Sequence, residues 1–132
     1  MKLSRDIAGQ NFIVTGAARG IGLAISTLFS SLGAQVSGWD LDVSDMQENS
    51  VFADAQVVDV TDEAATLSGF AASLQRLGDI DGIIANAGIN GPTKPMWEYS
   101  LTEWDAVMSV DLTGVFLTVK ASLDHFQTRE HG

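Results

Sequence analysis

A glycine-rich turn between a short apolar run and an amphipathic stretch constrains this chain more than any other feature. The turn reads TGAARGIG (residues 15–22) and begins at the last residue of the apolar run 11–15. Gly16, Gly20 and Gly22 suit a tight turn, a close approach of the backbone to an anion, and close packing of a helix on a strand. A helix that begins here directs unpaired N–H groups and the positive end of its dipole at that anion. Such turns are common, so the pattern gains weight only in a strand–turn–helix context.

Short apolar runs alternate with helical patterns along the rest of the chain, as in βαβ units. The sequence predicts strands at 11–15, 34–39, 51–58 and 82–86, and helices at 21–32, 61–77 and 103–127, with a short exposed helix within 40–49. Gly33 and Gly78 end the first two long helices, and Thr61 caps the second. Strand 82–86 is continuously apolar, which indicates burial on both faces. Right-handed crossovers give the strand order 3-2-1-4, an α/β fold with a Rossmann-type, doubly wound parallel sheet.

The composition narrows the possible functions. The 132 residues suit one domain, and the net charge of −10, from 17 acidic and 7 basic residues, argues against nucleic acid as a partner. The absence of cysteine excludes disulfides, thiolate catalysis and Cys-ligated zinc, and no other metal-ligand spacing is present. The polar N-terminus has no signal-peptide core, and we expect no apolar stretch that approaches the roughly 18 residues needed to span a bilayer. We therefore expect a soluble, cytoplasmic protein without metal or membrane contact.

Asp40 ends the second predicted strand, at the point where this fold binds the adenosine ribose. An acid there accepts hydrogen bonds from the ribose hydroxyls and repels a 2′-phosphate, which favours NAD over NADP. Arg19 opposes this preference, because a guanidinium can pair with a 2′-phosphate. An ordinary solvated turn acid is the alternative interpretation of Asp40. The neighbouring Trp39 could flank an adenine.

Several motifs together resemble the short-chain dehydrogenase/reductase family. The spacing Thr-Gly-x-x-x-Gly-x-Gly resembles the family's cofactor turn, and segment 104–116 resembles its long interface helix. Asp59-Val60 resembles the pair that contacts adenine, and Asn86-Ala87-Gly88 resembles the motif that lines the cofactor site. A helix-start acid and a plain tight turn are the simpler interpretations of Asp59 and Gly88. The resemblance covers nearly the whole chain and implies these cofactor-binding residues: Gly16, Arg19, Gly20, Ile21, Gly22, Asp40, Asp59, Val60, Asn86, Ala87 and Gly88.

The sequence departs from the family at the residues of catalysis. The family uses a Ser, a Tyr and a Lys four residues after the Tyr, all beyond a fifth strand, and an Asn on the long helix that completes a proton relay. Here the only tyrosine, Tyr99, precedes Glu103 by four positions, so no Tyr-x-x-x-Lys is present. Asp111 occupies the relay position, and an ionised aspartate offers no N–H donor. Natural variation and drift away from catalysis both fit this change.

These observations leave two hypotheses for the function. The resemblance implies an NAD(P)-dependent oxidoreductase that transfers hydride between nicotinamide and a small carbonyl or alcohol substrate, assembled as a homo-oligomer through the long helix. This chain is then its single cofactor-binding domain, truncated before the fifth strand, with an open apolar strand edge that needs a cover. The alternative is a non-catalytic dinucleotide-binding or interaction module. In either case we interpret Trp97, Tyr99 and Trp104 as core or subunit-contact aromatics.

Overall fold

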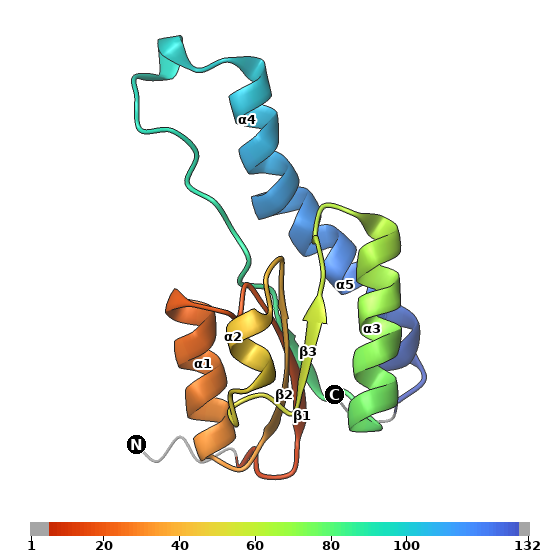
Figure 1. Cartoon of the computed structure of the whole chain (residues 1–132). Coiled ribbons are helices and arrows are strands. Elements are labelled where there is room, and N and C mark those ends of the chain that lie inside the picture. Colours follow the sequence, from red (N-terminus) through yellow and green to blue (C-terminus); the bar gives the residue numbers. More distant parts are fainter. Residues whose placement is uncertain (1–5, 130–132) are drawn as a thin grey trace.

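The computed structural model describes residues 6–129 and shows a parallel four-stranded sheet of order β3-β2-β1-β4 (Figure 1). The predicted α/β fold and strand order are therefore confirmed. The elements are β1 (Asn11–Thr15), α1 (Gly20–Ser31), β2 (Gln35–Asp40), α2 (Ser44–Gln47), β3 (Asp54–Val57), α3 (Glu63–Leu77), β4 (Gly82–Ile84), the 3-10 turn η1 (Met96–Glu98), α4 (Leu101–Met108), the π-helical segment η2 (Ser109–Thr113) and α5 (Gly114–Gln127).

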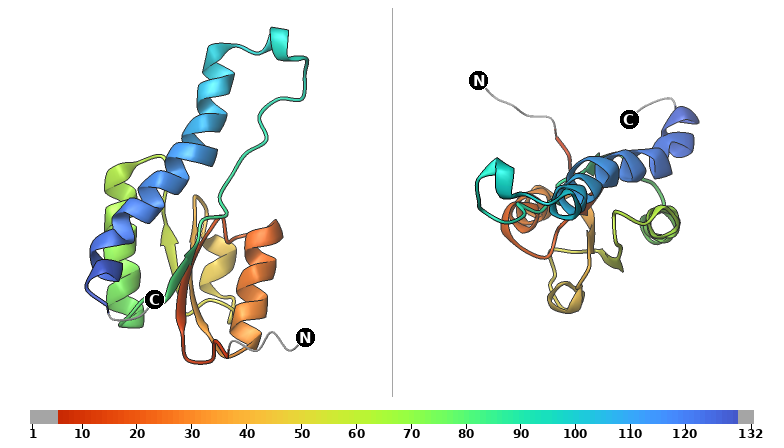
Figure 2. Two further views of the ribbon diagram at one scale, coloured as in Figure 1. Left: turned by 180° about the vertical axis from the view of Figure 1, so that it is seen from behind. Right: turned by 90° about the horizontal axis from the view of Figure 1, so that it is seen from above.

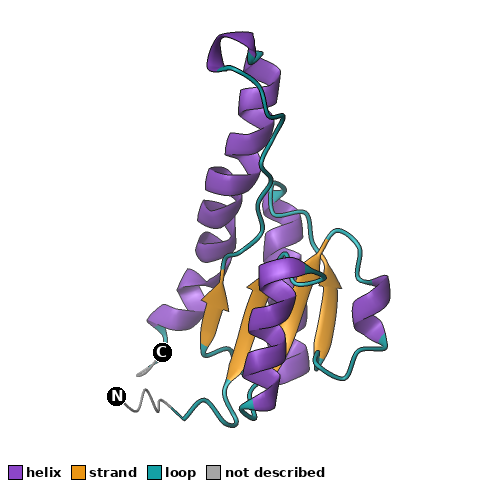
Figure 3. Ribbon diagram, turned by 90° about the vertical axis from the view of Figure 1, so that its left-hand side faces the viewer, coloured by secondary structure: helices purple, strands orange, loops and turns teal. Residues whose placement is uncertain are grey.

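Helices cover both faces of the sheet and create two separate cores. Figures 1 and 3 show α1 and α2 on one face, with α3 and α5 on the other. Successive residues of β1 point to opposite faces, so Ile13 joins the core under α3 and α5 while Val14 joins the core under α1 and α2. Both side chains are fully buried. This burial on both faces fixes the position of the central strands β1 and β2, and with it the position of their carboxyl ends.

The edge strands are shorter than the sequence predicts. Strand β4 ends at Ile84, and Ile83 and Ile84 are half-buried, so the prediction of burial on both faces is wrong. The reason is that, among the described residues, β4 pairs with β1 on one side only. Strand β3 lies at the opposite edge and begins at Asp54, and its Val57 is 67% exposed.

The start of α3 differs from the prediction by one residue. Asp62 caps the helix, because its Oδ1 accepts the N–H of Ala65 at 3.1 Å. Thr61, the predicted cap, instead donates its hydroxyl to Asp59 and lies one position too early to reach that N–H. Gly78 ends the helix with φ +83°, as predicted.

The predicted helix 103–127 is longer and less regular than expected. It begins at Leu101, where Ser100 and Glu103 form a capping box, and the π-helical η2 separates α4 from α5. Length and composition alone would allow Leu101–Gln127 to cross a membrane, a test that the core helices of soluble proteins also pass. Its second half, α5, packs beside α3 on the sheet (Figure 1).

Residues 89–108, which we call the arm, project beyond the carboxyl ends of the strands. Figure 2 shows the loop after β4 rising away from the sheet and α4 returning beside it. Trp97 and Trp104 lie in the arm and are 84% and 55% exposed, so a core role for these two residues is wrong. Tyr99 donates its hydroxyl to the carbonyl of Pro92 and thereby ties the loop to the start of α4.

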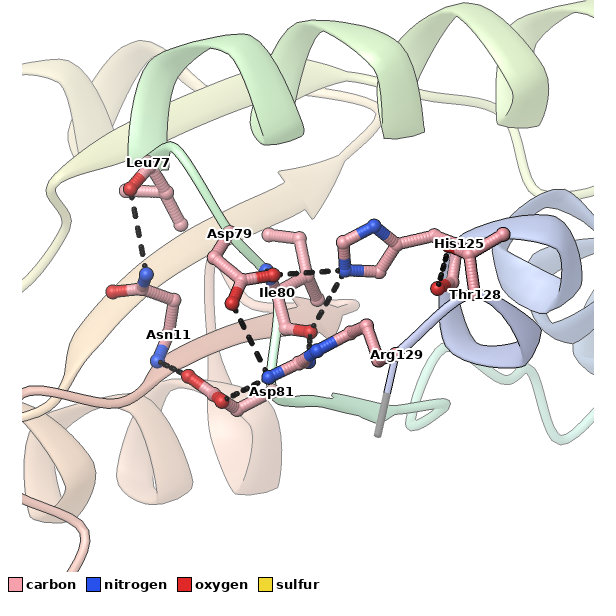
Figure 4. Close-up of polar contacts among 8 residues, drawn as sticks. All are labelled: Asn11, Leu77, Asp79, Ile80, Asp81, His125, Thr128 and Arg129. Carbon is pink, nitrogen blue, oxygen red and sulfur yellow. Dashed lines mark hydrogen bonds and ion pairs between the residues drawn. The ribbon is translucent and has the colours of Figure 1, made fainter. Parts of the chain in front are cut away.

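A cluster of polar and charged side chains fixes the opposite end of the sheet (Figure 4). His125 Nε2 lies 3.0 Å from Asp79 Oδ1, and Arg129 Nη2 lies 2.7 Å from Asp81 Oδ1 and 3.2 Å from Asp79 Oδ2. Asp81 Oδ2 also accepts the N–H of Asn11 at 2.8 Å. The end of α5 is thereby tied to the beginnings of β1 and β4, at the amino ends of the strands.

Candidate functional site

A cavity of about 440 Å³ lies at the carboxyl ends of the strands. Every sequence-predicted cofactor residue except Gly22 lines it. It is also lined by Trp39, for which the sequence suggested a place beside the adenine, and by Leu41, Val58, Ile89 and Val110, which sequence reasoning did not assign to the site. In open parallel sheets, ligands bind at this edge, beside the point where the strand order reverses. Here that point lies between β1 and β4.

The glycine turn closes the cavity on the side of α1. Gly16 and Gly20 have positive φ angles of +63° and +55°, and a Cβ on Gly20 would meet open space. Gly22 has a different role, because a Cβ there would lie 2.1 Å from the Gly16 carbonyl oxygen. Gly22 therefore lies beneath the turn and allows α1 to pack against it, which explains its absence from the cavity wall.

The N-terminus of α1 offers donors to the cavity. Its N-cap residue is Arg19, and within the described part of the chain no side chain caps this helix and no acid lies in its first turn. Helices α3 and α4, in contrast, are capped by Asp62 and Ser100. The first N–H groups of α1 consequently face the turn without a side-chain acceptor, an arrangement that suits an anion.

Asp40 links the end of β2 to the glycine turn. Its Oδ2 accepts the N–H of Ala18 at 3.0 Å, and its Oδ1 accepts the N–H of Leu41 at 2.8 Å. Each carboxylate oxygen keeps a further lone pair for a ligand hydroxyl. The Trp39 side chain is fully buried and donates its Nε1–H to Ser73 Oγ at 2.9 Å, so the suggestion that this indole flanks an adenine is wrong. Alternation along β2 explains this, since Asp40 and Trp39 point in opposite directions.

Thr15 and Asn86 join the ends of β1 and β4. The buried Thr15 Oγ1 accepts the N–H groups of Asn86 and Ala87 at 3.0 and 2.9 Å. In return, Asn86 Nδ2 donates to the carbonyls of Thr15 and Gly16 at 3.0 and 3.2 Å. Asn86 therefore holds the glycine turn and the loop after β4 together. Sequence reasoning missed the part of Thr15, whose only signal is a hydroxyl at the end of an apolar strand.

Asp59 and Val60 form the wall beyond β3. Asp59 is exposed, and its Oδ1 accepts the N–H and the hydroxyl of Thr61 at 2.9 and 2.7 Å. Val60 is buried, and its Cγ2 lies 2.7 Å from where a Cβ on Gly114 would be. Asp59 is thus engaged in its own turn while it faces the cavity, which fits both interpretations of this acid.

Asp111 lies on η2, just outside the cavity wall. Its Oδ1 accepts the N–H of Ile89 at 2.8 Å, and a Cβ on Gly88 would lie 3.2 Å from the same oxygen. The carboxylate therefore binds the loop that leaves β4, while its neighbour Val110 lines the cavity. Single-turn π segments within α-helices occur frequently at functional sites.

The charges on the cavity wall are those of Arg19, Asp40 and Asp59. Asp40 ends β2 and Asp59 follows β3, so both acids lie on the side remote from β4. Among residues 6–129, no group of three or more histidines and acids has an arrangement that could hold a metal ion. The wall combines free N–H donors beside the turn with acceptors beside β2 and β3, a distribution that fits an elongated ligand with an anionic centre and hydroxyl groups at one end.

The chain is similar to known proteins in sequence and in structure. A family profile described as short chain dehydrogenase matches residues 10–132. The chain is 35% identical over 134 residues to gluconate 5-dehydrogenase from Gluconobacter oxydans (strain 621H), covering 96% of this chain and 52% of that relative. The structure of NAD+-bound xylitol dehydrogenase matches with a TM-score of 0.91 and 28% identity, covering 97% and 52% of the two chains.

A second solved structure has the same fold over this region. The 3-ketoacyl-(acyl-carrier-protein) reductase from Brucella melitensis, complexed with NADH, matches with a TM-score of 0.86 and 25% identity, covering 92% of this chain and 52% of that one. The chain therefore spans about half the length of the curated relatives it matches.

Proposed function

This chain belongs to the short-chain dehydrogenase/reductase family, and on that premise we propose that it is the dinucleotide-binding portion of an NAD(P)-dependent oxidoreductase. The whole protein would transfer hydride between nicotinamide and a carbonyl or alcohol substrate. The observation that carries the proposal is the uncapped N-terminus of α1, which faces a cavity lined by Gly16, Gly20 and Asp40. Bound nicotinamide supplies the hydride acceptor or donor, and the residues of this chain position it.

The glycine turn fits a pyrophosphate. The N–H groups of the first turn of α1 have no side-chain acceptor, and Gly20 leaves open space where any other residue would place a Cβ. Ile21 and Arg19 flank these donors on the cavity wall. A pyrophosphate would receive both the N–H hydrogen bonds and the positive end of the helix dipole.

The proposed preference for NAD rests on Asp40. The Ala18 N–H holds its carboxylate in position, so the negative charge cannot easily turn away from a 2′-phosphate. Arg19 is exposed and lies within the turn, where its guanidinium could pair with a 2′-phosphate and so allow weaker binding of NADP. On the same side of the cavity, Asp59 and Val60 would contact the adenine.

The nicotinamide end of the site lies beside β4. Asn86, Ala87 and Gly88 line the cavity there, and Asp111 fixes the next N–H, that of Ile89. In this proposal Asp111 is a positioning residue that holds the loop after β4 against η2.

Self-association through the long helix is part of the proposal. Four large apolar side chains with helical spacing lie exposed along η2 and α5: Leu112, Phe116, Val119 and Leu123. Such a stripe supports contact with a second copy. We also propose a cytoplasmic location, and the net charge of −10 supports a soluble protein without nucleic acid partners.

A specific observation favours the second candidate function for these 132 residues on their own. They contain no Tyr-x-x-x-Lys, and Glu103 lies where a Lys would follow Tyr99. We therefore propose that this chain binds the dinucleotide without catalysing hydride transfer.

The test titrates the 132-residue chain with NAD+, NADH and NADP+ by calorimetry, with circular dichroism to verify folding. We expect NAD+ and NADH to bind, NADP+ to bind more weakly, and a panel of alcohols and ketones to produce no change in nicotinamide absorbance. A folded chain that binds none of the three nucleotides would overturn the first proposal. Steady turnover would overturn the second.

A further inference from the structure

Asn90 and Gly91 form the only Asn-Gly pair in the sequence, and they lie in the loop of the arm that rises from β4 (Figure 2). Asn90 is exposed, and asparagine is a thermolabile residue type. We infer that Asn90 is a site of spontaneous covalent modification, at which its side-chain amide is lost to water and aspartate or isoaspartate remains in the arm. This inference goes beyond the proposed function and does not depend on nucleotide binding.

The reaction needs water and no other reagent. The backbone nitrogen of Gly91 first attacks the side-chain carbon Cγ of Asn90. A C–N bond forms, the proton of the Gly91 N–H passes to the departing amide group, and ammonia leaves, so that a cyclic succinimide remains. Water then adds to one of the two ring carbonyls and opens the ring. The products are aspartate and isoaspartate, and in isoaspartate the main chain runs through the side-chain carbons.

Glycine at position 91 favours this ring closure. A side chain on the attacking residue would crowd its nitrogen, and Gly91 has none. Its φ angle of +65° lies in a region that glycine adopts without strain, so the backbone on the attacking side also keeps its freedom to rotate. The pair therefore places an exposed amide next to the least hindered backbone nitrogen that an asparagine can have.

The fold leaves both reacting groups of this pair unengaged. Within the described residues 6–129, the Asn90 side chain has no hydrogen-bond partner and the Gly91 N–H has no acceptor. The amide can therefore turn towards the nitrogen, and the nitrogen can lose its proton without breaking a hydrogen bond of the fold.

The other three asparagines of the sequence are restrained. Asn86 Nδ2 donates to two backbone carbonyls, and the N–H that follows it, that of Ala87, is bound by Thr15 Oγ1 at 2.9 Å. Asn11 is buried in β1, and its Nδ2 donates to a carbonyl of α3 at 3.4 Å. Asn49 Oδ1 accepts the backbone N–H two residues ahead at 3.0 Å. Each of the three is also followed by a residue with a side chain, so Asn90 should react first.

The modification would change the arm where its loop contacts α4. A Cβ on Gly91 would lie 2.7 Å from Val107 Cγ2, so the loop and the helix approach each other closely at this point. Isoaspartate lengthens the main chain by one carbon atom immediately before Gly91. Both products also add a negative charge to a residue that lines the same groove as Trp104. We therefore expect isoaspartate to displace the loop from α4 and to change the surroundings of Trp104.

The test incubates the full chain at mildly alkaline pH, where the backbone nitrogen loses its proton more readily, in buffer and in urea. Mass spectrometry follows the replacement of NH2 by OH at each asparagine, and an isoaspartyl methyltransferase detects isoaspartate. Asn86 is an internal control, because it lies with Asn90 in one tryptic peptide, 77–120, in which Pro95 protects the bond after Lys94.

The comparison between buffer and urea measures what the fold does to each site. We expect folding to slow the reaction of Asn90 by less than about threefold and that of Asn86 by more than about tenfold, because only Asn86 must first be released by local unfolding. If folding slows Asn90 as much as it slows Asn86, the arm protects the pair and the modification site is overturned.

Asn90→Gln is the matched variant for the effect on the arm. It keeps an exposed amide, but ring closure needs one more carbon atom and is far slower, so no isoaspartate should form at position 90. The NMR resonance of the Trp104 indole N–H should shift as the wild type ages and stay constant in the variant, with circular dichroism to verify that both remain folded. Complete conversion of Asn90 without a change at Trp104 would overturn the effect on the arm.

Discussion

Asp40 Oδ2 accepts the backbone N–H of Ala18 at 3.0 Å, so the acid that ends β2 also holds the glycine turn that follows β1. The proposed ribose contact and the shape of the phosphate-binding turn therefore depend on one carboxylate. A substitution that removes the whole side chain disturbs both, whereas one that removes only the charge separates them.

Asp40→Asn should change the nucleotide preference while it leaves the turn intact. The amide oxygen of asparagine can still accept the Ala18 N–H, but the negative charge that repels a 2′-phosphate is lost. We expect the ratio of NADP+ to NAD+ affinity to rise by about tenfold or more, which corresponds to about 1.4 kcal/mol. Calorimetric titration of both nucleotides gives the ratio.

Asp40→Ala should raise the same ratio and in addition lower the free energy of unfolding in urea by about 1–2 kcal/mol, because the Ala18 N–H loses its acceptor. Asp42→Asn is the matched control. Asp42 is an exposed acid that binds the N–H of Ser44 and is not part of the cavity wall. An unchanged nucleotide ratio in Asp40→Asn would contradict the role assigned to Asp40.

Thr15→Val should destabilise the fold although it preserves the shape of the side chain. The hydroxyl of Thr15 accepts two N–H groups, those of Asn86 and Ala87, and a valine leaves both without this acceptor. We expect the free energy of unfolding to fall by about 2–4 kcal/mol. Thr15→Ser keeps the hydroxyl and should lose less than about half of that. Equal losses in the two variants would show that the hydroxyl contributes no more to stability than the methyl group that serine lacks.

Gly22→Ala and Gly20→Ala should have opposite profiles. At Gly22 a Cβ would meet the Gly16 carbonyl oxygen at 2.1 Å and Asn86 Nδ2 at 2.7 Å, so we expect a stability loss of about 3 kcal/mol or more. At Gly20 the space is open and only the positive φ penalises alanine, by about 1–2 kcal/mol. Gly20→Ala should nevertheless bind NAD+ more weakly, because its Cβ would lie on the cavity wall. Undiminished NAD+ affinity in Gly20→Ala would argue against a pyrophosphate at the turn.

The predictable part of this site is the part encoded by local sequence. The glycine turn, its position between β1 and α1, and Asp40 at the end of β2 follow from periodicity and spacing, and the strand order then brings them together. The contacts that complete the site join residues far apart in the chain, such as Thr15 with Asn86 and Ile89 with Asp111. No local pattern marks a hydroxyl as an acceptor for N–H groups 71 and 72 residues away, so these roles required the fold.

The arm shows a second limit of prediction from sequence, because residue type predicted burial where the structure shows exposed side chains. Trp97 and Trp104 are large aromatics of a kind usually buried, and composition alone indicates a core. The chain instead places them on a projecting segment, where the contacts between Lys94, Glu103 and Ser100 set the geometry. A pattern of apolar residues predicts that these side chains will be covered, but it does not predict which part of this chain or which other molecule covers them.

Glu103 should make the stability of the arm depend on acid pH. The hydrogen bond from Lys94, followed by those from the N–H and hydroxyl of Ser100, lowers the pKa of Glu103 from its usual 4.5 to about 2. Because the folded state holds the proton less tightly than the unfolded state, this contribution is fully present above pH 4.5 and is lost as the pH falls towards 2. Trp104 lies beside Glu103, so its fluorescence reports on the arm.

We therefore expect wild-type arm stability in urea to decline between pH 4.5 and 2 more steeply than that of Glu103→Gln, which cannot titrate there. Lys94→Met should reduce the difference, because it removes the largest cause of the lowered pKa. Glu98→Gln, at an exposed position of η1, is the matched control and should follow the wild-type profile. Parallel profiles for wild type and Glu103→Gln across this range would show that the Lys94–Glu103–Ser100 contacts do not hold the arm in solution.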